Sequence, residues 1–527
     1  MRVRASQQIL SLDHAEERGD PLRLALIFAL AFVMAGLPVF LHVISQPLAI
    51  GFCVVAAVLA ATKLERDVPI FVLTVTIFQN FFVALASPNF NDIASVEPLK
   101  AYSFVTTVVV WLVVMTKFAL ARRTFSPFVR KMVYASGALF AVYGFYFLAG
   151  LAIDARNSIV YFRNLVVPLL LFQLFLIVAA RHKLEAPRIV AVLLTLLVVA
   201  GYIELFAVDF WLRLTNGWTY LTLLYAPRLT SLTELKIAAA SGVVFTNVLD
   251  YSTSDPLNLP LFAGADIKLQ RLLGPNFHPI SFGYVLAALI VFAALHRRVL
   301  LALLAAPLLI MTNAKGPLVV MTIGVVFFLV ARRRSDYLAF AGLLLTLAAY
   351  FLFVFWSGRD SGDYHVLGLM GGVNGFFNNP LGHTLAEGGN LSIQEFASLD
   401  WQRFQSQGAA DFAVESGVGV MLFQLGVAAA AAFAFYAWVV WTSWRLFRVT
   451  RAPALALATG ALATHLVNGA FQEEAYFAPL ALGLVLAFAG LAFGATDYAL
   501  ASRAAECAAS EAQRSDLWVM RAAATRG

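Results

Sequence analysis

Long apolar segments alternate with polar ones along almost the whole chain. An apolar run of about 17 to 25 residues can cross the hydrocarbon core of a bilayer as a helix, which satisfies its backbone hydrogen bonds internally. The pattern predicts an all-α polytopic membrane protein. We expect about 14 spans (about 12–14), at 21–44, 47–62, 68–87, 98–116, 132–153, 159–180, 189–206, 279–295, 299–312, 317–331, 338–356, 415–442, 452–467 and 478–495. The second, ninth, tenth and thirteenth runs are short, and a re-entrant or tilted arrangement stays open for them.

Two polar stretches are much longer than the other connections, at 207–278 and 357–414. Connections of this length are usually functional or disordered. We therefore expect one integral membrane domain over 1–495 with two long loops. The tail 496–527 is Ala-rich with scattered charge, and is expected to form a short helix or to be disordered.

Composition supports a membrane protein surrounded by lipid. Apolar residues make up 61% of the chain and charged residues 13%, against about half and about a quarter in soluble domains. The net charge of +7 does not indicate a nucleic-acid partner, because the basic excess lies in loops on one side of the predicted spans. The two cysteines, Cys53 and Cys507, indicate neither a disulfide nor a metal cluster.

Basic residues distinguish the two sides of the predicted bundle. The loops on one side hold eighteen lysines and arginines, whereas the short loops on the other side hold Arg156 and Lys315, with Lys100 at a helix end. By the positive-inside rule the basic loops are cytoplasmic. Both termini are then predicted to be cytoplasmic, and both long stretches are predicted to face outward.

Ionisable residues at the edges of the spans gather on the predicted outer side. Such groups are costly in a bilayer and are usually functional. A transporter would need coupling residues near mid-membrane, so this pattern favours a substrate reached from outside or from the outer leaflet. Apart from basic anchors at inner ends, these residues are Lys100, Asp154, Arg156, Arg163, Glu204, Lys315, Glu415 and His465.

Arg163 is the first candidate for binding an anion. It lies about one turn into the sixth predicted span, where a guanidinium needs an anionic partner and its planar fork suits a phosphate. The alternative is that Arg163 snorkels to the interface or pairs with Asp154 or Glu204. Arg156, in the same segment, is a further candidate cation.

Arg271 is the second candidate, in a segment that leads into the eighth predicted span. Gly274 and Pro275 predict a turn, Asn276 adds a polar side chain, and a helix N-terminus that favours an anion follows. His278 could cap this helix or act as an acid or base. The alternative for Arg271 is an ordinary loop arginine.

Lys315, Glu415 and His383 complete the candidate chemistry. Lys315 lies in a tight outer turn, where it would bind an anion or anchor the chain at the interface. Glu415 is predicted in the first helical turn of the twelfth span, on one face with Asp411 if the helix has begun by then. Partial burial would raise its pKa and suit it as a base. Histidine is the side chain best suited to act as a base near neutral pH, so His383 is a candidate base, and His365 and His465 rank below it. No spacing of acids indicates a metal site.

These segments, in this order, resemble the O-antigen polymerase/O-antigen ligase superfamily of bacterial envelope glycosyltransferases, over roughly 151–482. Arg271-Leu-Leu-Gly-Pro-Asn276 is similar to the family's Arg…Gly…Asn segment before a span. Thr312-Asn-Ala-Lys315-Gly316 stands where the family commonly has Ser-Arg-Gly. The family's Asn-Pro…Gly, large periplasmic loop and glycine-marked helix resemble Asn379-Pro-Leu-Gly382, the polar stretch that follows, Glu415-Ser416, and Phe423-Gln-Leu-Gly426.

Two departures from the family pattern affect the predicted activity. Lys315 replaces the usual arginine and gives a point charge instead of a planar fork. Ligases carry a histidine at the end of the large loop, before the exit helix, whereas 407–415 contains none. The resemblance therefore favours a polymerase.

The resemblance implies a GT-C-type glycosyltransferase of the bacterial inner membrane. It would join undecaprenyl-pyrophosphate-linked oligosaccharide repeats into O-antigen or exopolysaccharide on the periplasmic face, without a metal, a cofactor or a nucleotide sugar. A chain-length regulator and a flippase are implied as partners. Cations would neutralise the leaving pyrophosphate, and a base would activate the acceptor hydroxyl. The implied substrate-binding residues are Arg163, Arg271, Lys315, Arg156, Asn276 and His278, and the implied catalytic residues are Glu415 and His383.

Three alternatives remain open at this point. A ligase would transfer finished glycan to lipid A-core or to a protein, and its loss would lead to accumulation of long lipid-linked chains. A lipid-linked glycan transporter would carry polar residues through the inner half of the bundle. A non-catalytic scaffold for envelope assembly would tolerate loss of Arg271.

Overall fold

The computed structural model describes residues 21–229, 249, 252–258, 268–334, 337–392 and 399–524. Most of these residues are helical, and the described part contains ten helices long and apolar enough to cross a membrane. The count is eleven if the bent pair Glu65–Ile77 and Gln79–Asn89 forms one span. Two further apolar helices, α14 and α15, are shorter. An all-α polytopic membrane protein is thus confirmed, but the structure does not provide fourteen helices of spanning length among these residues.

The first half of the chain forms a run of antiparallel helices that ends in a small external region. Its helices are α2 (Pro21–Ile44), α3 (Gln46–Lys63), α4 (Val68–Ile77), α5 (Gln79–Ala86), α6 (Ile93–Val96), α7 (Ala101–Leu120), α8 (Pro127–Leu151), α9 (Ala155–Arg181), α10 (Ala186–Phe206), α11 (Val208–Leu214) and α12 (Gly217–Leu229). Two short strands, β1 (Thr253–Ser254) and β2 (Leu269–Gln270), then pair antiparallel.

The second half adds the remaining helices of the bundle. They are α14 (Pro279–Leu295), α15 (Val299–Met311), α16 (Lys315–Arg333), α17 (Tyr337–Ser361), α18 (Tyr364–Asn378), α19 (Trp401–Gln407), α20 (Gly417–Leu425), α21 (Ala429–Thr450), α22 (Pro453–Asn468), α23 (Glu473–Phe477) and α24 (Leu482–Ala524).

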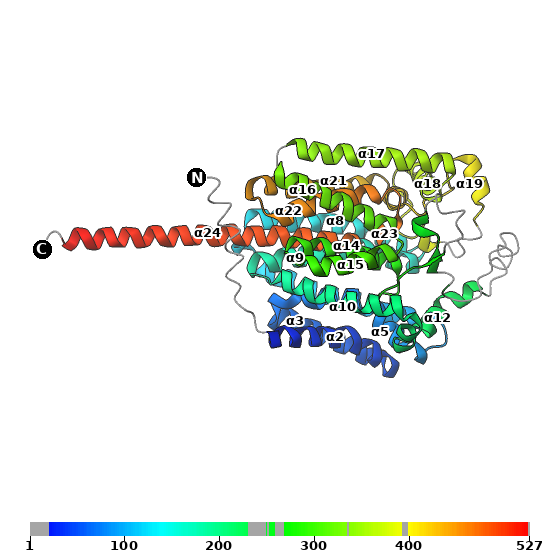
Figure 1. Cartoon of the computed structure of the whole chain (residues 1–527), viewed down its shortest axis with the longest axis horizontal. Coiled ribbons are helices and arrows are strands. Elements are labelled where there is room, and N and C mark those ends of the chain that lie inside the picture. Colours follow the sequence, from blue (N-terminus) through cyan, green and yellow to red (C-terminus); the bar gives the residue numbers. More distant parts are fainter. Residues whose placement is uncertain are drawn as a thin grey trace.

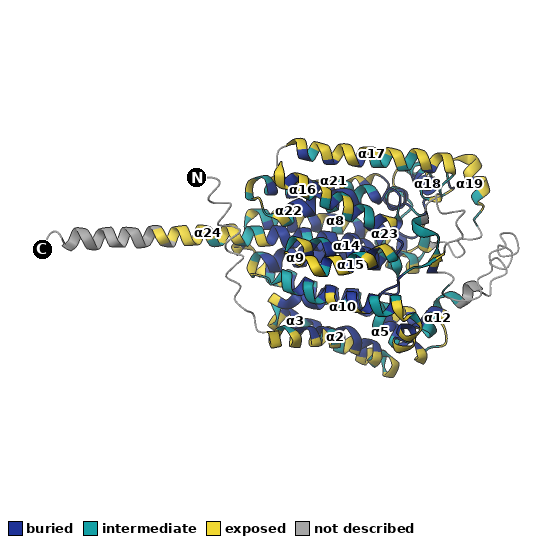
Figure 2. Ribbon diagram, viewed as in Figure 1, coloured by how far each residue is buried: buried dark blue, intermediate teal, exposed yellow. Residues whose placement is uncertain are grey.

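The helix α9 lies at the centre of the bundle. Its apolar window is 89% buried, against 17% for α17 at the periphery, and Figure 2 shows the same contrast between dark interior helices and exposed outer ones. The helix α24 packs along α9, and α7 and α8 flank it. Residues on α9 are therefore shielded from the lipid that would surround α2 and α17.

The two ends of the bundle differ in what they carry. The helices α12, α18 and α19 lie at one end, called here the α18 end, and α24 projects from the opposite end, called the α24 end (Figure 1). Both long polar stretches therefore emerge at the α18 end, as the alternation of spans predicts. Much of the first stretch, including 230–248 and 259–267, lies outside the described residues, as do residues 1–20.

Several predicted boundaries need correction. The stretch 357–414 is not one loop, because α17 continues to Ser361 and α18 and α19 follow. The twelfth span begins at Gly417 and breaks at Gly426, which has a φ of 54°. The third span bends by 48° between α4 and α5. The tail is neither disordered nor a separate helix over 496–524, since α24 runs without interruption to Ala524.

Candidate functional site

Several of the described helices at the α18 end begin with a side-chain N-cap, and four of these caps lie close to the candidate residues. Asp154 caps α9, His278 caps α14, Asp363 caps α18 and Ser416 caps α20. Each cap accepts a hydrogen bond from a backbone N–H that the helix leaves free. The predicted capping role of His278 is confirmed, since its Nδ1 accepts from the Ser281 N–H at 3.2 Å. These caps fix where the external segments join the bundle.

Arg271 is held against the turn between α15 and α16. The Leu272 N–H donates to the Met311 carbonyl at 3.0 Å, and the Arg271 Nε–H donates to the Thr312 carbonyl at 3.0 Å. Only Nε of the guanidinium is used in this contact, so its terminal nitrogens are left to face other groups. The segment thus anchors Arg271 by its backbone and by one edge of its fork.

Glu204 of α10 supports the same segment from below. Its carboxylate, 3% exposed, accepts from the Leu273 and Gly274 N–H groups at 2.7 Å each. Gly274 has a φ of 63°, and a Cβ there would lie 2.4 Å from the Phe282 ring, so the turn requires glycine. Glu204 therefore stabilises the loop that carries Arg271, and the alternative that it pairs with Arg163 is wrong.

The charge of Arg271 is balanced by groups from other elements. Burial lowers the pKa of Arg271, while the Glu474 carboxylate and the Tyr225 and Tyr364 hydroxyls act in the opposite direction. Nevertheless, the described part of the chain contains no carboxylate within 4.0 Å of its guanidinium. Arg271 is thus a largely buried cation close to an acidic group but without a direct ion pair.

Glu415 lies beside His365 at the start of α18. The His365 Nδ1 is 3.7 Å from the Glu415 carboxylate and 3.1 Å from its carbonyl oxygen. The Glu415 N–H donates to the Asn390 Oδ1 at 3.0 Å, and the Glu415 φ of 58° is a left-handed conformation that non-glycine residues seldom adopt. Backbone strain of this kind is common where a side chain must be aimed in one direction.

The helical context expected for Glu415 is wrong. The helix α20 begins at Gly417, so Glu415 precedes both the helix and its Ser416 cap. Asp411 does not share a helix face with Glu415, because it pairs with Arg403 at 3.0 Å on the surface. The helix dipole therefore does not account for a carboxylate at this position.

The surroundings of Glu415 shift its pKa. Burial raises the pKa of Glu415 well above its usual range, and the carboxylates of Glu474 and Glu473 raise it further. Like charges and low polarity both disfavour ionisation, which is how proteins tune a carboxyl group toward neutral pH. Glu415 therefore has the raised pKa that was expected from partial burial.

A row of glycines on α18 brings the Glu415 segment close. A Cβ at Gly368 would lie 1.7 Å from the Val414 carbonyl, and one at Gly372 would lie 2.3 Å from the Gly419 carbonyl. The backbones of α18 and residues 410–419 are thus in direct contact. This contact is what sets the distance between His365 and Glu415, which belong to different segments.

Two acids of α23, Glu473 and Glu474, were missed by the sequence analysis. Glu473 is 4% exposed and accepts from the Tyr161 hydroxyl at 3.0 Å and from the Asn390 N–H at 2.9 Å. Burial raises the pKa of Glu473 to about 8, against the lowering effect of these bonds. The signal was present as two adjacent acids in the short connection between two apolar runs.

A second group of cations lines a polar cavity of about 160 Å³. This volume is far more than the roughly 15 Å³ that one water molecule requires. The described cavity wall contains two cations and no acid. Its lining residues are Thr76, Gln79, Asn80, Lys100, Ser103, Phe104, Thr107, Arg163, Val167, Asn276, Ser281, Pro479 and Leu480.

Arg163 has only one hydrogen-bond partner among the described residues. Its Nε–H donates to Asn164 Oδ1 at 3.3 Å, and no carboxylate there lies within 4.0 Å of it. Asp154, the other partner considered, caps α9 instead. Asn276, which also lines the cavity, is held by an Asn80 Nδ2–H that donates to its backbone carbonyl at 2.8 Å.

Lys315 begins α16 on the side of the site formed by α18. The Asp363 carboxylate interacts electrostatically with its ammonium group. Gly316 packs tightly, since a Cβ there would lie 2.1 Å from Gln472 Oε1. The Lys-Gly pair thus brings α16 against the residues that precede α23.

Two candidate residues lie apart from these groups. His383 stacks on Phe423 with ring centroids 4.1 Å apart and is 3.4 Å from the Glu387 carboxylate. Phe423 is eight residues beyond Glu415, or about two helical turns. Arg156 forms an exposed pair with both Glu97 carboxylate oxygens at 2.9 Å. The structure therefore brings neither residue to Arg271, Glu415 or the cavity.

The α18 end thus contains two distinct centres. In the first, called here the acid–base centre, Glu474 lies within electrostatic range of both Arg271 and Glu415. His365 lies beside Glu415, and Lys315 interacts with Asp363 at the start of α18. Arg163 and Lys100 form the second, called the cation cavity. No group of three or more His, Cys, Asp or Glu side chains in the described ranges could hold a metal ion.

Comparison with known proteins adds no name to this site. No family model matches the chain. No curated protein matches it either.

Proposed function

We propose that this protein is a glycosyltransferase that polymerises undecaprenyl-pyrophosphate-linked oligosaccharide repeats on the periplasmic face of the bacterial inner membrane. One observation carries the proposal: Arg271, a partly buried arginine without a direct ion pair, and Glu415, a partly buried carboxyl group of raised pKa, both lie within electrostatic range of Glu474. A cation that can accept phosphate charge and a base that can activate a hydroxyl are the two functions such a transfer requires.

In the proposed reaction, an acceptor sugar hydroxyl attacks the anomeric carbon of the donor sugar. The new glycosidic C–O bond forms as the bond from that carbon to the pyrophosphate oxygen breaks. The hydroxyl proton passes to the Glu415 carboxylate, and the polyprenyl pyrophosphate leaves with the bonding electron pair. Arg271, helped by Lys315, stabilises the negative charge that develops on the leaving oxygen.

His365 has a supporting role in this proposal. Its Nδ1 is within 3.7 Å of the Glu415 carboxylate, so an imidazole can orient the carboxyl group or relay its proton. The same residue supports a second candidate, a ligase that transfers finished glycan to lipid A-core or to a protein. Ligases in the resembling family carry a histidine before the exit helix, and here α18 supplies one beside Glu415.

The deciding experiment is mass spectrometry of polyprenyl-pyrophosphate species extracted from a strain that lacks this protein. Accumulation of single repeat units would support the polymerase, and accumulation of long lipid-linked chains would support the ligase. An unchanged pool would contradict both and favour a transporter or scaffold. Complementation with Arg271→Ala, compared with wild type at equal protein level in the membrane, would tie the result to the acid–base centre.

A further inference from the structure

The two centres of the α18 end are separated by the segment 271–276. Arg271 lies at the α15–α16 turn, and Asn276 lines the cation cavity beside α5. Five residues of extended chain span at most about 17 Å. Of the described residues, His278 lies within electrostatic range of both Arg271 and Lys100. The centres are therefore neighbours, but they do not share lining residues.

The cation cavity has the composition of an anion site. Arg163 and Lys100 both line it, and each lacks a carboxylate within 4.0 Å in the described part of the chain. Glu97 acts on Arg163 only from beyond ion-pair distance, and two partly buried cations without a direct carboxylate partner favour the binding of an anion. Amide and hydroxyl groups complete the wall, in Gln79, Asn80 and Ser103. These groups can donate hydrogen bonds to phosphate oxygens.

The absence of an acid from the described cavity wall also separates the roles of the two centres. A donor pyrophosphate is attached to the attacked carbon, so it must bind beside the base. The partly buried acids Glu415 and Glu474 belong to the acid–base centre. The cation cavity has no described carboxylate to accept a proton, so a pyrophosphate bound there would not react.

We infer that the cation cavity is a second pyrophosphate subsite, which holds the lipid-linked acceptor while Arg271 holds the donor. This inference rests on the proposed polymerisation, in which both substrates carry a pyrophosphate. The acceptor keeps its pyrophosphate through the reaction, and its reacting hydroxyl lies at the far end of the repeat. Separate subsites keep the second lipid-linked pyrophosphate away from the base.

The first test is the number of pyrophosphate sites on the full-length protein in detergent. Equilibrium binding of inorganic pyrophosphate should give two sites per chain for wild type. Arg163→Ala combined with Lys100→Ala should leave one, and Arg163→Lys should weaken that site without removing it. Arg156→Ala is the matched control on the same helix and should keep two sites. One site in wild type, or two in the double variant, would overturn the inference.

The second test assigns the subsites by kinetics. One substrate analogue has its acceptor hydroxyl blocked and can only donate, and another has a non-cleavable phosphonate at the anomeric carbon and can only accept. Arg163→Ala should raise KM for the acceptor-only analogue at least tenfold, with a smaller change in KM for the donor-only analogue. Equal changes in both would overturn the assignment. Binding is measured without turnover, so two sites can be found even if the lipid-pool experiment rejects polymerisation.

Discussion

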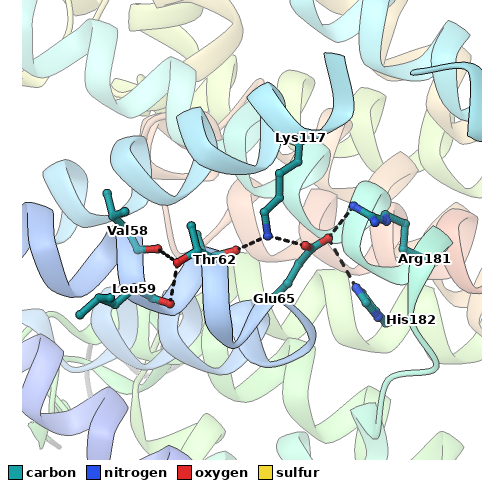
Figure 3. Close-up of polar contacts among 8 residues, drawn as sticks. Val58, Leu59, Thr62, Glu65, Lys117, Arg181 and His182 are labelled. Atoms are coloured by element: carbon teal, nitrogen blue, oxygen red, sulfur yellow. Dashed lines mark hydrogen bonds and ion pairs between the residues drawn. The ribbon is translucent and has the colours of Figure 1, made fainter. Parts of the chain in front are cut away.

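The helices α7 and α9 each carry a basic residue near both ends of the bundle, and the two pairs have different surroundings. At the α24 end, Lys117 of α7 and Arg181 of α9 share the carboxylate of Glu65 (Figure 3). At the α18 end, Lys100 precedes α7 and Arg163 lies on α9, and they line a cavity without a described acid. The same two helices thus present paired cations at one end and unpaired cations at the other, roughly 25 Å away.

The paired end has the properties of a structural contact. The Lys117 Nζ lies 2.6 Å from the Glu65 carboxylate and also donates to the Ala61 carbonyl at 2.8 Å. Arg181 is 3.1 Å from the same carboxylate and the His182 imidazole 3.4 Å from it. Glu65 precedes α4, so one carboxylate joins the ends of three helices. Because these charges neutralise each other within the fold, they attract a charged ligand only weakly.

The unpaired end has the properties of a binding site. Charged side chains are rarely buried without a partner, because the loss of hydration must be offset. Arg163, Lys100 and Arg271 are partly buried at one end of the bundle, and none of them has a carboxylate within 4.0 Å among the described residues. They contact neutral groups, such as the Tyr220 ring over which Lys100 lies. The comparison teaches that positive charge alone does not mark function in this protein. A better indicator of a binding site is a cation that has no carboxylate partner among the described residues.

The largest expected effect is that of Arg271→Ala on glycan transfer. Removing a preorganised cation from the leaving group should lower the rate about 10³-fold. Polymer formation from purified lipid-linked repeats would be measured by gel or mass spectrometry. Arg271→Lys should recover part of the rate, since it keeps the charge but loses the fork.

The control for this prediction is Arg403→Ala. Arg403 is half exposed and paired with Asp411 at 3.0 Å, so its loss should leave the rate within a factor of about two. If a folded Arg271→Ala protein formed polymer at nearly the wild-type rate, the proposed difference in function between paired and unpaired cations would be contradicted.

The next largest effect is that of Glu415→Gln, which should lower the rate about 10²-fold. A base must be deprotonated, and the pKa of Glu415 is raised by burial and then by Glu474 and Glu473. The wild-type rate should therefore rise with pH through a range well above that of an ordinary glutamate. In the variant this rise should disappear from the pH profile of kcat.

His383→Ala serves as the comparison for Glu415→Gln. His383 stacks on Phe423 away from the acid–base centre, so its loss should change neither the rate nor the pH profile by a comparable amount. If the pH dependence disappears in His383→Ala and persists in Glu415→Gln, the base is the histidine.

The fold was largely predictable from sequence, because apolar run length decides whether a helix can span. The prediction of a loop was wrong within the polar stretch 357–414, which contains the helices α18 and α19. The helix α18 carries Gly368, Gly371, Gly372 and Gly375, and glycine lowers helix propensity, so the segment resembled a loop. Their spacing of three and four residues is helical, and it was the available signal for a closely packed helix.

Some single residues of the candidate site could be named from the sequence, but Glu473 and Glu474 were missed and the grouping could not be predicted. Arg163, Arg271 and Asn276 were identified as single residues from charge and position. Their division into two centres depends on the path of 271–276 over Glu204 and on the bend that places Asn80 beside Asn276. Such contacts join residues more than sixty positions apart, and one sequence contains no signal for them.

At the paired end, Glu65→Gln should affect stability and not catalysis. Glu65 is 12% exposed in its side chain, and its loss leaves Lys117, Arg181 and His182 close together without a counter-ion. We expect a loss of about 1–3 kcal/mol in the free energy of unfolding, seen as a lower Tm in detergent. The rate per folded molecule should stay at the wild-type level. A catalytic loss at unchanged Tm would show that the α24 end contributes to function.

The smallest expected effect is that of Arg156→Ala, and it makes the sharpest comparison within one helix. Arg156 and Arg163 both lie in the first part of α9 at the α18 end, but the Arg156 side chain is 75% exposed and paired with Glu97. An exposed pair is worth at most about 1 kcal/mol, so Tm should barely change and the transfer rate should not. Arg163→Ala should instead reduce transfer at low acceptor concentration. If both variants reduced transfer equally, proximity to the membrane surface would explain both residues. If only Arg163→Ala reduced transfer, the cause would be the property in which the two arginines differ. Arg156 has a carboxylate partner within the fold, and Arg163 has none within 4.0 Å among the described residues.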